Sequence, residues 1–301
     1  LEVQDPEPQD LLNFVSKMEF RTLTKRLAEK LKVEVPLIID TVESVRINEV
    51  PQPILIDPSK YETIRDSACL QVWIDRIYAR GYVAVDTETT GLNEMRADLV
   101  GVSLCVDAGQ AGYLPLSHRA GQADDLFGTD ALAEGQMEQV TALAMLKTML
   151  EDSTIMKIGQ NMKYDAKILA RVGIQISPID DTMLMSYAQN GGLHNHGMDF
   201  LSERYLGHVP ISIKTLLGSG KSAITFDRVP VDEATRYAAE DADITLRLWQ
   251  YLKPRLHRNK VTVVYETLER PLVPVLAEME MCGIKVDRDS LSRMSNGFAQ
   301  K

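Results

Sequence analysis

The sequence predicts an α/β fold over the middle of the chain. Short runs rich in apolar and β-branched residues alternate there with longer segments whose apolar residues recur at helical spacing. Glycines, prolines and polar loops separate these runs. With 301 residues, of which 45% are hydrophobic, the chain can bury the core of one good-sized domain and parts of others.

Two segments precede the α/β region. Residues 9–31 have apolar residues at helical spacing and are predicted to form one or two short helices. Residues 32–59 contain four prolines among β-branched residues, and we predict an extended linker between domains. The α/β domain itself is predicted to cover residues 60–256, and residues 257–301 are predicted to begin a further domain.

The α/β region begins with a predicted helix over residues 67–80, which Gly81 ends because glycine readily adopts the left-handed conformation at helix ends. Three predicted strands follow, at 82–86, 99–106 and 112–116, and they are expected to form a meander. A polar, Gly-rich surface loop is predicted after them, at 118–135. A helix over 136–151 and a short strand over 154–158 come next.

Helices dominate the rest of the chain. Four are predicted at 161–172, 181–190, 198–206 and 231–256. Pro271 and Pro274 punctuate a last long helix over 261–281, which leads through a turn or short strand at 283–287 to a final helix.

Composition excludes some classes of protein. A net charge of −10 argues against a domain that binds duplex DNA through a large positively charged surface. It does not argue against a nuclease whose metal ions neutralise the phosphate. No apolar run approaches the roughly 18–20 residues of a membrane span, and no signal peptide opens the chain. The three cysteines have no metal-like spacing, so we expect reduced thiols in a cytoplasmic protein. Because the chain starts at Leu1 and stops within a helical pattern, we expect it to be a piece of a longer protein.

The first of three polar motifs follows the strand at 82–86. Asp86 and Glu88 are two residues apart, so in an extended chain their carboxylates share one face and can meet one cation. Gly91 permits close backbone approach, and Leu92 places an apolar side chain beside the acids. Alone, this motif also fits a solvated turn that caps the strand.

The other two motifs lie on predicted helices. Asn161 and Asp165 are separated by four residues, as are Tyr237 and Asp241, so the members of each pair share a helix face. Alone, the first pair also fits a helix cap with an acid in the first turn, and the second an ordinary amphipathic helix. Asp243 is expected to face away from Asp241.

Taken together, the motifs predict a metal site. Carboxylates that converge through the fold repel one another strongly, and a divalent cation is the usual relief. Oxygen ligands suit Mg²⁺ or Mn²⁺, and two such ions on one phosphate make a phosphodiester hydrolase. No histidine stands four or five residues before Asp241. His194 and His196 could instead form a zinc pair or contacts within a solvated loop, and a solvated loop is favoured.

The strings VDTETTGL (85–92), GQNMKYDAKIL (159–169), DTMLMSY (181–187) and RYAAEDADITLRL (236–248) resemble the 3′–5′ exonuclease domain of the bacterial DNA polymerase I family (family A), in the tyrosine variant of the DEDD superfamily. The resemblance spans roughly residues 60–256. It implies a ribonuclease H-like fold with a mixed central sheet flanked by helices. Residues 1–31 resemble the helical tail of a preceding 5′-nuclease domain, and 257–301 the truncated start of the polymerase domain.

The resemblance also implies roles for individual residues. Asp86, Glu88, Asp165 and Asp241 would be the ligands of two divalent ions, and Tyr237 would position the attacking water. Leu92 resembles the wedge against the terminal base, and further substrate contacts are implied at Thr89, Gln160, Asn161 and Tyr164. The chain departs from the family at Ile213 and Asn195, where an aromatic residue and an arginine often contribute to the strand-binding cleft.

The activity implied is proofreading hydrolysis of the 3′-terminal phosphodiester of single-stranded or frayed DNA, releasing a deoxynucleoside monophosphate. The implied partners are such a DNA end and the polymerase domain of the same full-length chain, and the implied location is cytoplasmic, associated with the nucleoid. Two alternatives stay open. One is an RNA exonuclease of the ribonuclease D type, and the other is a catalytically silent domain that spaces its neighbours or holds single-stranded DNA.

Overall fold

The computed structural model describes residues 7–18, 20–33, 56–120, 131–220 and 223–300. The chain divides into two compact units, Leu1–Val50 and Pro51–Lys301. In the first unit, α1 (Pro8–Lys17) and α2 (Arg21–Leu31) bury Leu12, Val15 and Ala28. The prediction of one or two short helices is therefore confirmed, with two present, whereas most of the predicted linker lies outside the described residues.

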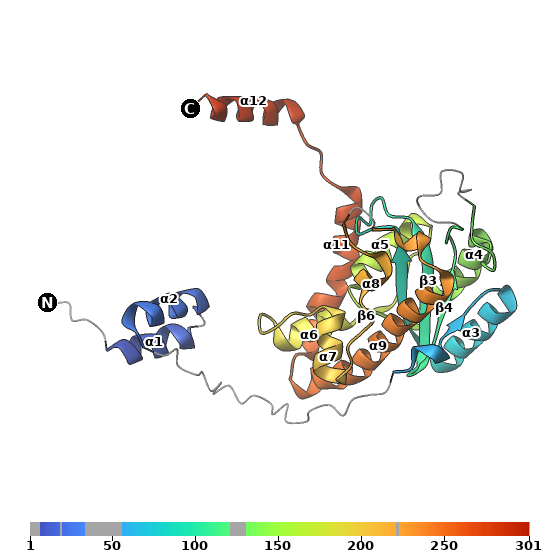
Figure 1. The fold of residues 1–301 in the computed structure, drawn as a ribbon, viewed down its shortest axis with the longest axis horizontal. Coiled ribbons are helices and arrows are strands. Elements are labelled where there is room, and N and C mark those ends of the chain that lie inside the picture. Colours follow the sequence, from blue (N-terminus) through green and yellow to red (C-terminus); the bar gives the residue numbers. More distant parts are fainter. Residues whose placement is uncertain (1–6, 19, 34–55, 121–130, 221–222, 301) are drawn as a thin grey trace. The chain divides into compact units, whose positions relative to one another are not determined.

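The second unit is built on a six-stranded mixed sheet with the strand order β1-β4-β3-β2-β5-β6 (Figure 1). The predicted meander is present as β2 (Tyr82–Thr89), β3 (Leu99–Asp107) and β4 (Gln110–Pro115), which pair antiparallel. Three short strands extend it in parallel pairs: β1 (Glu62–Thr63), β5 (Met156–Gly159) and β6 (Ile179–Asp181). The edge strands β1 and β6 were not predicted, because two or three residues carry no readable periodicity.

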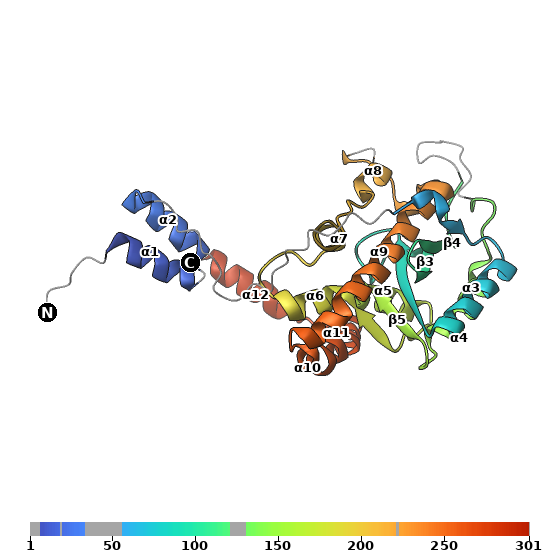
Figure 2. The same ribbon diagram turned by 90° about the horizontal axis from the view of Figure 1, so that it is seen from below.

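Helices cover both faces of the sheet, as predicted. Residues of α3 (Ser67–Arg80), α4 (Gln139–Leu150) and α5 (Met162–Arg171) share a buried core with Val83 and Val85 of β2. The long helix α9 (Val231–Arg258) packs instead against Ala84 of β2 (Figure 2). Because successive strand residues face opposite ways, the odd-numbered residues of β2 face α5 and the even-numbered residues face α9.

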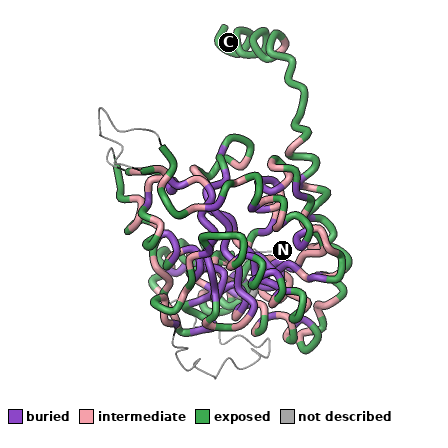
Figure 3. The backbone as a smooth tube through the Cα atoms, turned by 90° about the vertical axis from the view of Figure 1, so that its right-hand side faces the viewer, coloured by how far each residue is buried: buried purple, intermediate pink, exposed green. Residues whose placement is uncertain are grey.

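Shorter helices complete the unit. Residues of α6 (Thr182–Asn190) and α7 (Met198–Leu206) share a second core with α9, and α8 (Ile213–Leu217) packs beside Phe226. Figure 3 shows the buried residues gathered in the middle of this unit, with exposed residues around them. The helix predicted at 67–80 has those bounds, and Gly81 ends it in the left-handed conformation with a φ of 75°.

Two predictions in the last part of the chain were wrong in detail. The single helix expected at 261–281 consists of α10 (Thr262–Val264), a π-helical turn (Tyr265–Glu269) and α11 (Arg270–Cys282). Pro271 lacks an N–H, and its ring would clash with the carbonyl four residues back, so a wider turn precedes it. Residues 283–287, predicted as a turn or short strand, form neither, and α12 (Arg288–Ala299) follows as the predicted final helix.

Candidate active site

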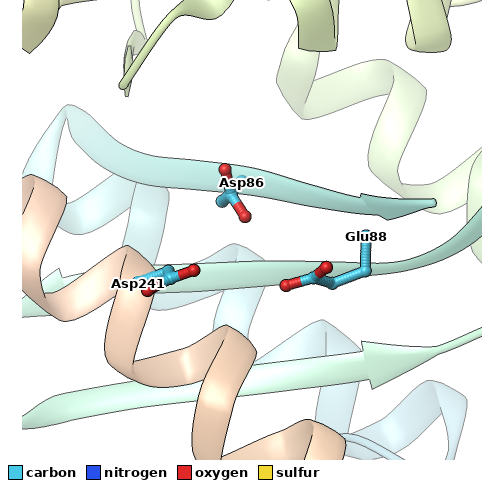
Figure 4. Close-up of side chains that lie close together, drawn as sticks. All are labelled: Asp86, Glu88 and Asp241. Atoms are coloured by element: carbon cyan, nitrogen blue, oxygen red, sulfur yellow. The ribbon is translucent and has the colours of Figure 1, made fainter. Parts of the chain in front are cut away.

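Three carboxylates meet where the carboxyl end of β2 passes α9. Asp86 and Glu88 face the α9 side of the sheet, and Asp241 lies on α9, about three turns after its start. One carboxylate oxygen from each residue lies within 4.8 Å of the other two. Figure 4 shows these three side chains turned toward one another. The two-residue period of a strand and the position of a long helix across it thus produce a compact acidic cluster.

This cluster has no compensating charge among the described residues that contact it. Burial and the Asp241 carboxylate hold the pKa of Asp86 well above its ordinary value, and burial with Asp86 does the same to the pKa of Glu88. Glu88 is only 8% exposed, and its Oε1 atom is buried with no hydrogen-bond partner. An orphaned carboxylate oxygen facing two other acids is the donor arrangement that a hard divalent cation satisfies.

Asp165 reaches the same region from the opposite face of the sheet. It lies in the first turn of α5, is buried, and uses its Oδ1 atom to accept hydrogen bonds from the backbone N–H and hydroxyl of Thr87, at 3.0 and 2.6 Å. Burial and the Asp86 charge raise its pKa, while the bonds from Thr87 act against that rise. The structure therefore sets Asp165 beside the three-carboxylate cluster rather than within it.

Tyr237 lies one helical turn before Asp241 on α9 and is half-buried. Its ring packs beside Phe226, with the centroids 5.9 Å apart. Burial, the Asp241 carboxylate and a hydrogen bond with that carboxylate raise the pKa of the phenol, so the hydroxyl keeps its proton at neutral pH. A neutral phenol at this place can orient a water molecule but is a poor proton acceptor.

The residues predicted to contact substrate near β2 form a connected group. The Tyr164 hydroxyl donates to the Gly91 carbonyl at 2.7 Å and is hydrogen-bonded to the Thr89 hydroxyl. Leu92 follows, 94% exposed. The close backbone approach expected at Gly91 is not made by the chain itself, because no atom lies within 4 Å of the place a Cβ would take.

Gln160 and Asn161 are placed differently from one another. The Gln160 amide donates to the His196 carbonyl at 2.8 Å and accepts from Thr182, so its polar groups already have partners. Asn161 is exposed, adopts a left-handed backbone with a φ of 62°, and makes no side-chain cap. The capping alternative was therefore wrong for its side chain, since the Asp181 carboxylate accepts from the backbone N–H groups of Asn161 and Met162 instead.

Asp181 was missed by the sequence analysis as a residue that supports the site. It also accepts from Met183 and Leu184, so one carboxylate holds the starts of both α5 and α6. An aspartate directly before a helical pattern is a helix-capping signal, so the sequence could have revealed that Asp181 caps α6, but not that it also holds the start of α5.

The competing residues occupy other places. Asp243 faces away from the cluster, as expected, and bonds with Tyr61, Gly109 and Arg247. The rings of His194 and His196 lie 4.8 Å apart and bond to Asn195 and Ser186, and no metal cluster of the described residues includes them. The Asn195 side chain accepts from the Gly197 N–H, and Ile213 packs beside Phe226.

Comparison with known proteins identifies the class. Residues 61–257, well over half of the chain, match a family model described as 3′–5′ exonuclease, and the chain belongs to this family. It is similar to the DNA polymerase I of Rhizobium leguminosarum, with 41% identity over 98% of this chain and 35% of that protein. The chain thus spans about a third of the length of the curated relatives it matches.

Solved structures support the ribonuclease H-like fold. Pol1 of M. smegmatis has 21% identity and a TM-score of 0.59, covering 79% of this chain and 35% of that one. Escherichia coli RNase D has 17% identity and a TM-score of 0.53, covering 73% of this chain and 51% of that one. At these identities the likeness shows the fold alone. Among the described residues, no helix is long and apolar enough to cross a membrane.

Proposed function

We propose that this chain is the proofreading 3′–5′ exonuclease portion of a DNA polymerase I and removes the 3′-terminal nucleotide of single-stranded or frayed DNA as a deoxynucleoside monophosphate. The observation that carries the proposal is the cluster of Asp86, Glu88 and Asp241 with its orphaned buried Glu88 oxygen. Family membership implies divalent metal use, and these donors fit a hard cation.

Two Mg²⁺ or Mn²⁺ ions, when bound, would supply a water of lowered pKa and a Lewis acid for the leaving oxygen. Asp86, Glu88 and Asp241 would hold one ion, Asp86 would be shared with the second, and Asp165 would act partly through water. The neutral Tyr237 hydroxyl orients the attacking water. Leu92 packs against the terminal base, while Thr89, Gln160, Asn161 and Tyr164 contact the last nucleotides.

The energetics of the substrate explain the preference for frayed ends. Unpairing a terminal base costs a few kcal/mol in a matched duplex and less at a mismatch. A site that accepts a single unpaired terminus therefore removes mismatched nucleotides faster. Tolerance of sequence would come from stacking and from a narrow cleft rather than from base readout.

A second candidate, an RNA exonuclease, has support in the fold shared with RNase D. The higher identity to DNA polymerase I over nearly the whole chain favours DNA. We further propose that residues 1–31 and 257–301 are the tail of a 5′-nuclease domain and the start of the polymerase domain, on either side of a linker at 32–59 and the exonuclease domain at 60–256. A cytoplasmic, nucleoid-associated location accords with three cysteines that form no disulfide.

The test is digestion of 5′-labelled DNA and RNA oligomers of one sequence with Mg²⁺, with Mn²⁺ or with chelator. Stepwise shortening of DNA that chelator abolishes is the expected result. Faster shortening of RNA would favour the ribonuclease D alternative. Binding without shortening under both metals would favour the silent domain, and cleavage of circular single strands would contradict an exonuclease.

A further inference from the structure

The exposed Leu92 sits on a loop that is closed on itself. At its base, the Thr90 N–H donates to the Asp98 carbonyl at 3.0 Å, and the Asp98 N–H donates to the Thr90 hydroxyl at 2.9 Å. Within it, Asn93 accepts from the backbone N–H groups of Arg96 and Ala97. We call residues 90–98 the Leu92 loop. Its two ends continue β2 and β3, which fix the base of the loop, and its own bonds give the rest of it a shape.

Beyond its base, the loop is held by one face of α5. Tyr164, Lys167 and Arg171 are three and four residues apart, so their side chains form a row along the helix. Tyr164 donates to the Gly91 carbonyl, Lys167 pairs with the Glu94 carboxylate, and Arg171 donates to the carbonyls of Glu94 and Ala97. The row therefore holds the Leu92 loop at its start, middle and end.

Lys167 is the central member of this row. Its side chain is only 2% exposed, and it pairs with two carboxylates, Glu94 of the loop and Glu280 of α11. Burial lowers the pKa of Lys167, but Glu280 and Glu94 raise it more, so the ammonium stays charged. Glu280 also pairs with Lys163 at 2.7 Å, which ties α11 to the same helix.

We infer that Lys167 and Arg171 are positioning residues for terminal-base discrimination, because they fix the Leu92 loop to the helix that carries Asp165. This inference rests on the proposed function. Since α5 bears both the row and Asp165, the loop and the carboxylate site share one rigid support. If the loop were released from that support, paired and unpaired 3′ termini would be hydrolysed at more similar rates.

The test compares Lys167→Met, which keeps the length and apolar stem of the side chain, with Leu92→Ala and with wild type. Each protein is assayed on oligomers with a paired and with a mismatched 3′ end, and on thymidine 5′-(4-nitrophenyl phosphate), a phosphodiester with no second base. Lys147→Met is the matched control, because Lys147 of α4 pairs with Glu151 at the end of that helix and is 46% exposed.

We expect Lys167→Met to lower kcat/KM on the mismatched oligomer about 10-fold, mainly through KM, and to bring the mismatched-to-paired ratio close to that of Leu92→Ala. Hydrolysis of the nitrophenyl ester should change less than about twofold, and Lys147→Met should match wild type throughout. Glu94→Gln removes the charge of the loop partner of Lys167 and should lower the mismatched-to-paired ratio in the same way. Lys167→Arg, which keeps the positive charge, should retain most of the wild-type ratio.

Two outcomes would overturn the inference. One is a wild-type ratio in both Lys167→Met and Glu94→Gln. The other is an equal loss on oligomers and on the nitrophenyl ester, which would assign Lys167 a general structural role. A wild-type protein with no metal-dependent hydrolysis at all would instead refute the proposed function, so the two failures are distinguishable.

Discussion

Thr87 donates both its backbone N–H and its hydroxyl to the same carboxylate oxygen of Asp165. Thr87 stands between Asp86 and Glu88 but faces the other side of the sheet, toward α5. The strand β2 therefore carries Asp86 and Glu88 on one face of the sheet and, through Thr87, contacts Asp165 on the other face. The two bonds counter the repulsion that Asp165 would otherwise add to the three-carboxylate cluster.

Thr87→Val should weaken catalysis while preserving the fold. Valine keeps the shape and the backbone N–H but removes one hydrogen bond to Asp165, a loss of about 1–3 kcal/mol for a buried carboxylate. We expect a fall in kcat of about 10-fold and weaker metal affinity, measured by titrating Mg²⁺ in the exonuclease assay. Thr141→Val, which removes an exposed hydrogen bond to Glu138, is the control and should change neither kcat nor metal affinity. Unchanged metal affinity in Thr87→Val would show that the hydroxyl does not tune Asp165.

Asp86→Ala should lower hydrolysis by about 10³-fold or more. In the proposed site this carboxylate is shared by both ions, so its loss removes both. Because the substitution also relieves repulsion with Glu88 and Asp241, the melting temperature in chelator should hold or rise. Asp75→Ala on the exposed face of α3 is the control. Near-normal turnover in well-folded Asp86→Ala would refute its assignment as a metal ligand.

Stability of the metal-free protein should fall as the pH rises. The pKa values of Asp86, Glu88, Asp165 and Asp241 all lie above their ordinary values, so the folded state holds these protons more tightly than the unfolded state. Their contribution is complete below the ordinary value of 3.8 for aspartate and is lost as pH passes the folded-state pKa. Melting in chelator at successive pH values measures this.

Two comparisons make that pH measurement specific. Asp86→Asn should flatten the decline, because one repelling charge is gone. Saturating Mg²⁺ should reverse it, since the metal competes with protons and its stabilisation grows as the acids ionise. An identical pH slope in wild type and Asp86→Asn would show that the cluster does not control stability.

Tyr237→Phe should lower turnover by about 10–10³-fold, equivalent to about 1.4–4 kcal/mol for one positioned hydrogen bond. The ring packing beside Phe226 is retained, so melting temperature and metal affinity should change little. Tyr78→Phe on the exposed side of α3 is the control. If Tyr237→Phe instead unfolds, or keeps wild-type turnover when folded, Tyr237 is a packing residue.

Local pattern was sufficient for much of the fold. The helix at 67–80 and α9 were predictable because their helical periodicity extends over many residues, and the three-stranded meander because its strands are apolar runs separated by polar residues. The edge strands β1 and β6 were not, since two or three residues are too few to show a periodic pattern. The π-helical turn before Pro271 depends on how the backbone relieves a local clash, which hydrophobic pattern does not encode.

For the site, the sequence by itself determined which side chains are available and that Asp86 and Glu88 share a face, because strand period is a local property. Only the tertiary structure decided that Asp241 joins them within 4.8 Å while Asp165 bonds to Thr87. It also placed Lys167 between Glu94 and Glu280, which no motif suggested. The physical reason is that these relationships join separate elements, and their distances follow from how helices pack across both faces of one sheet.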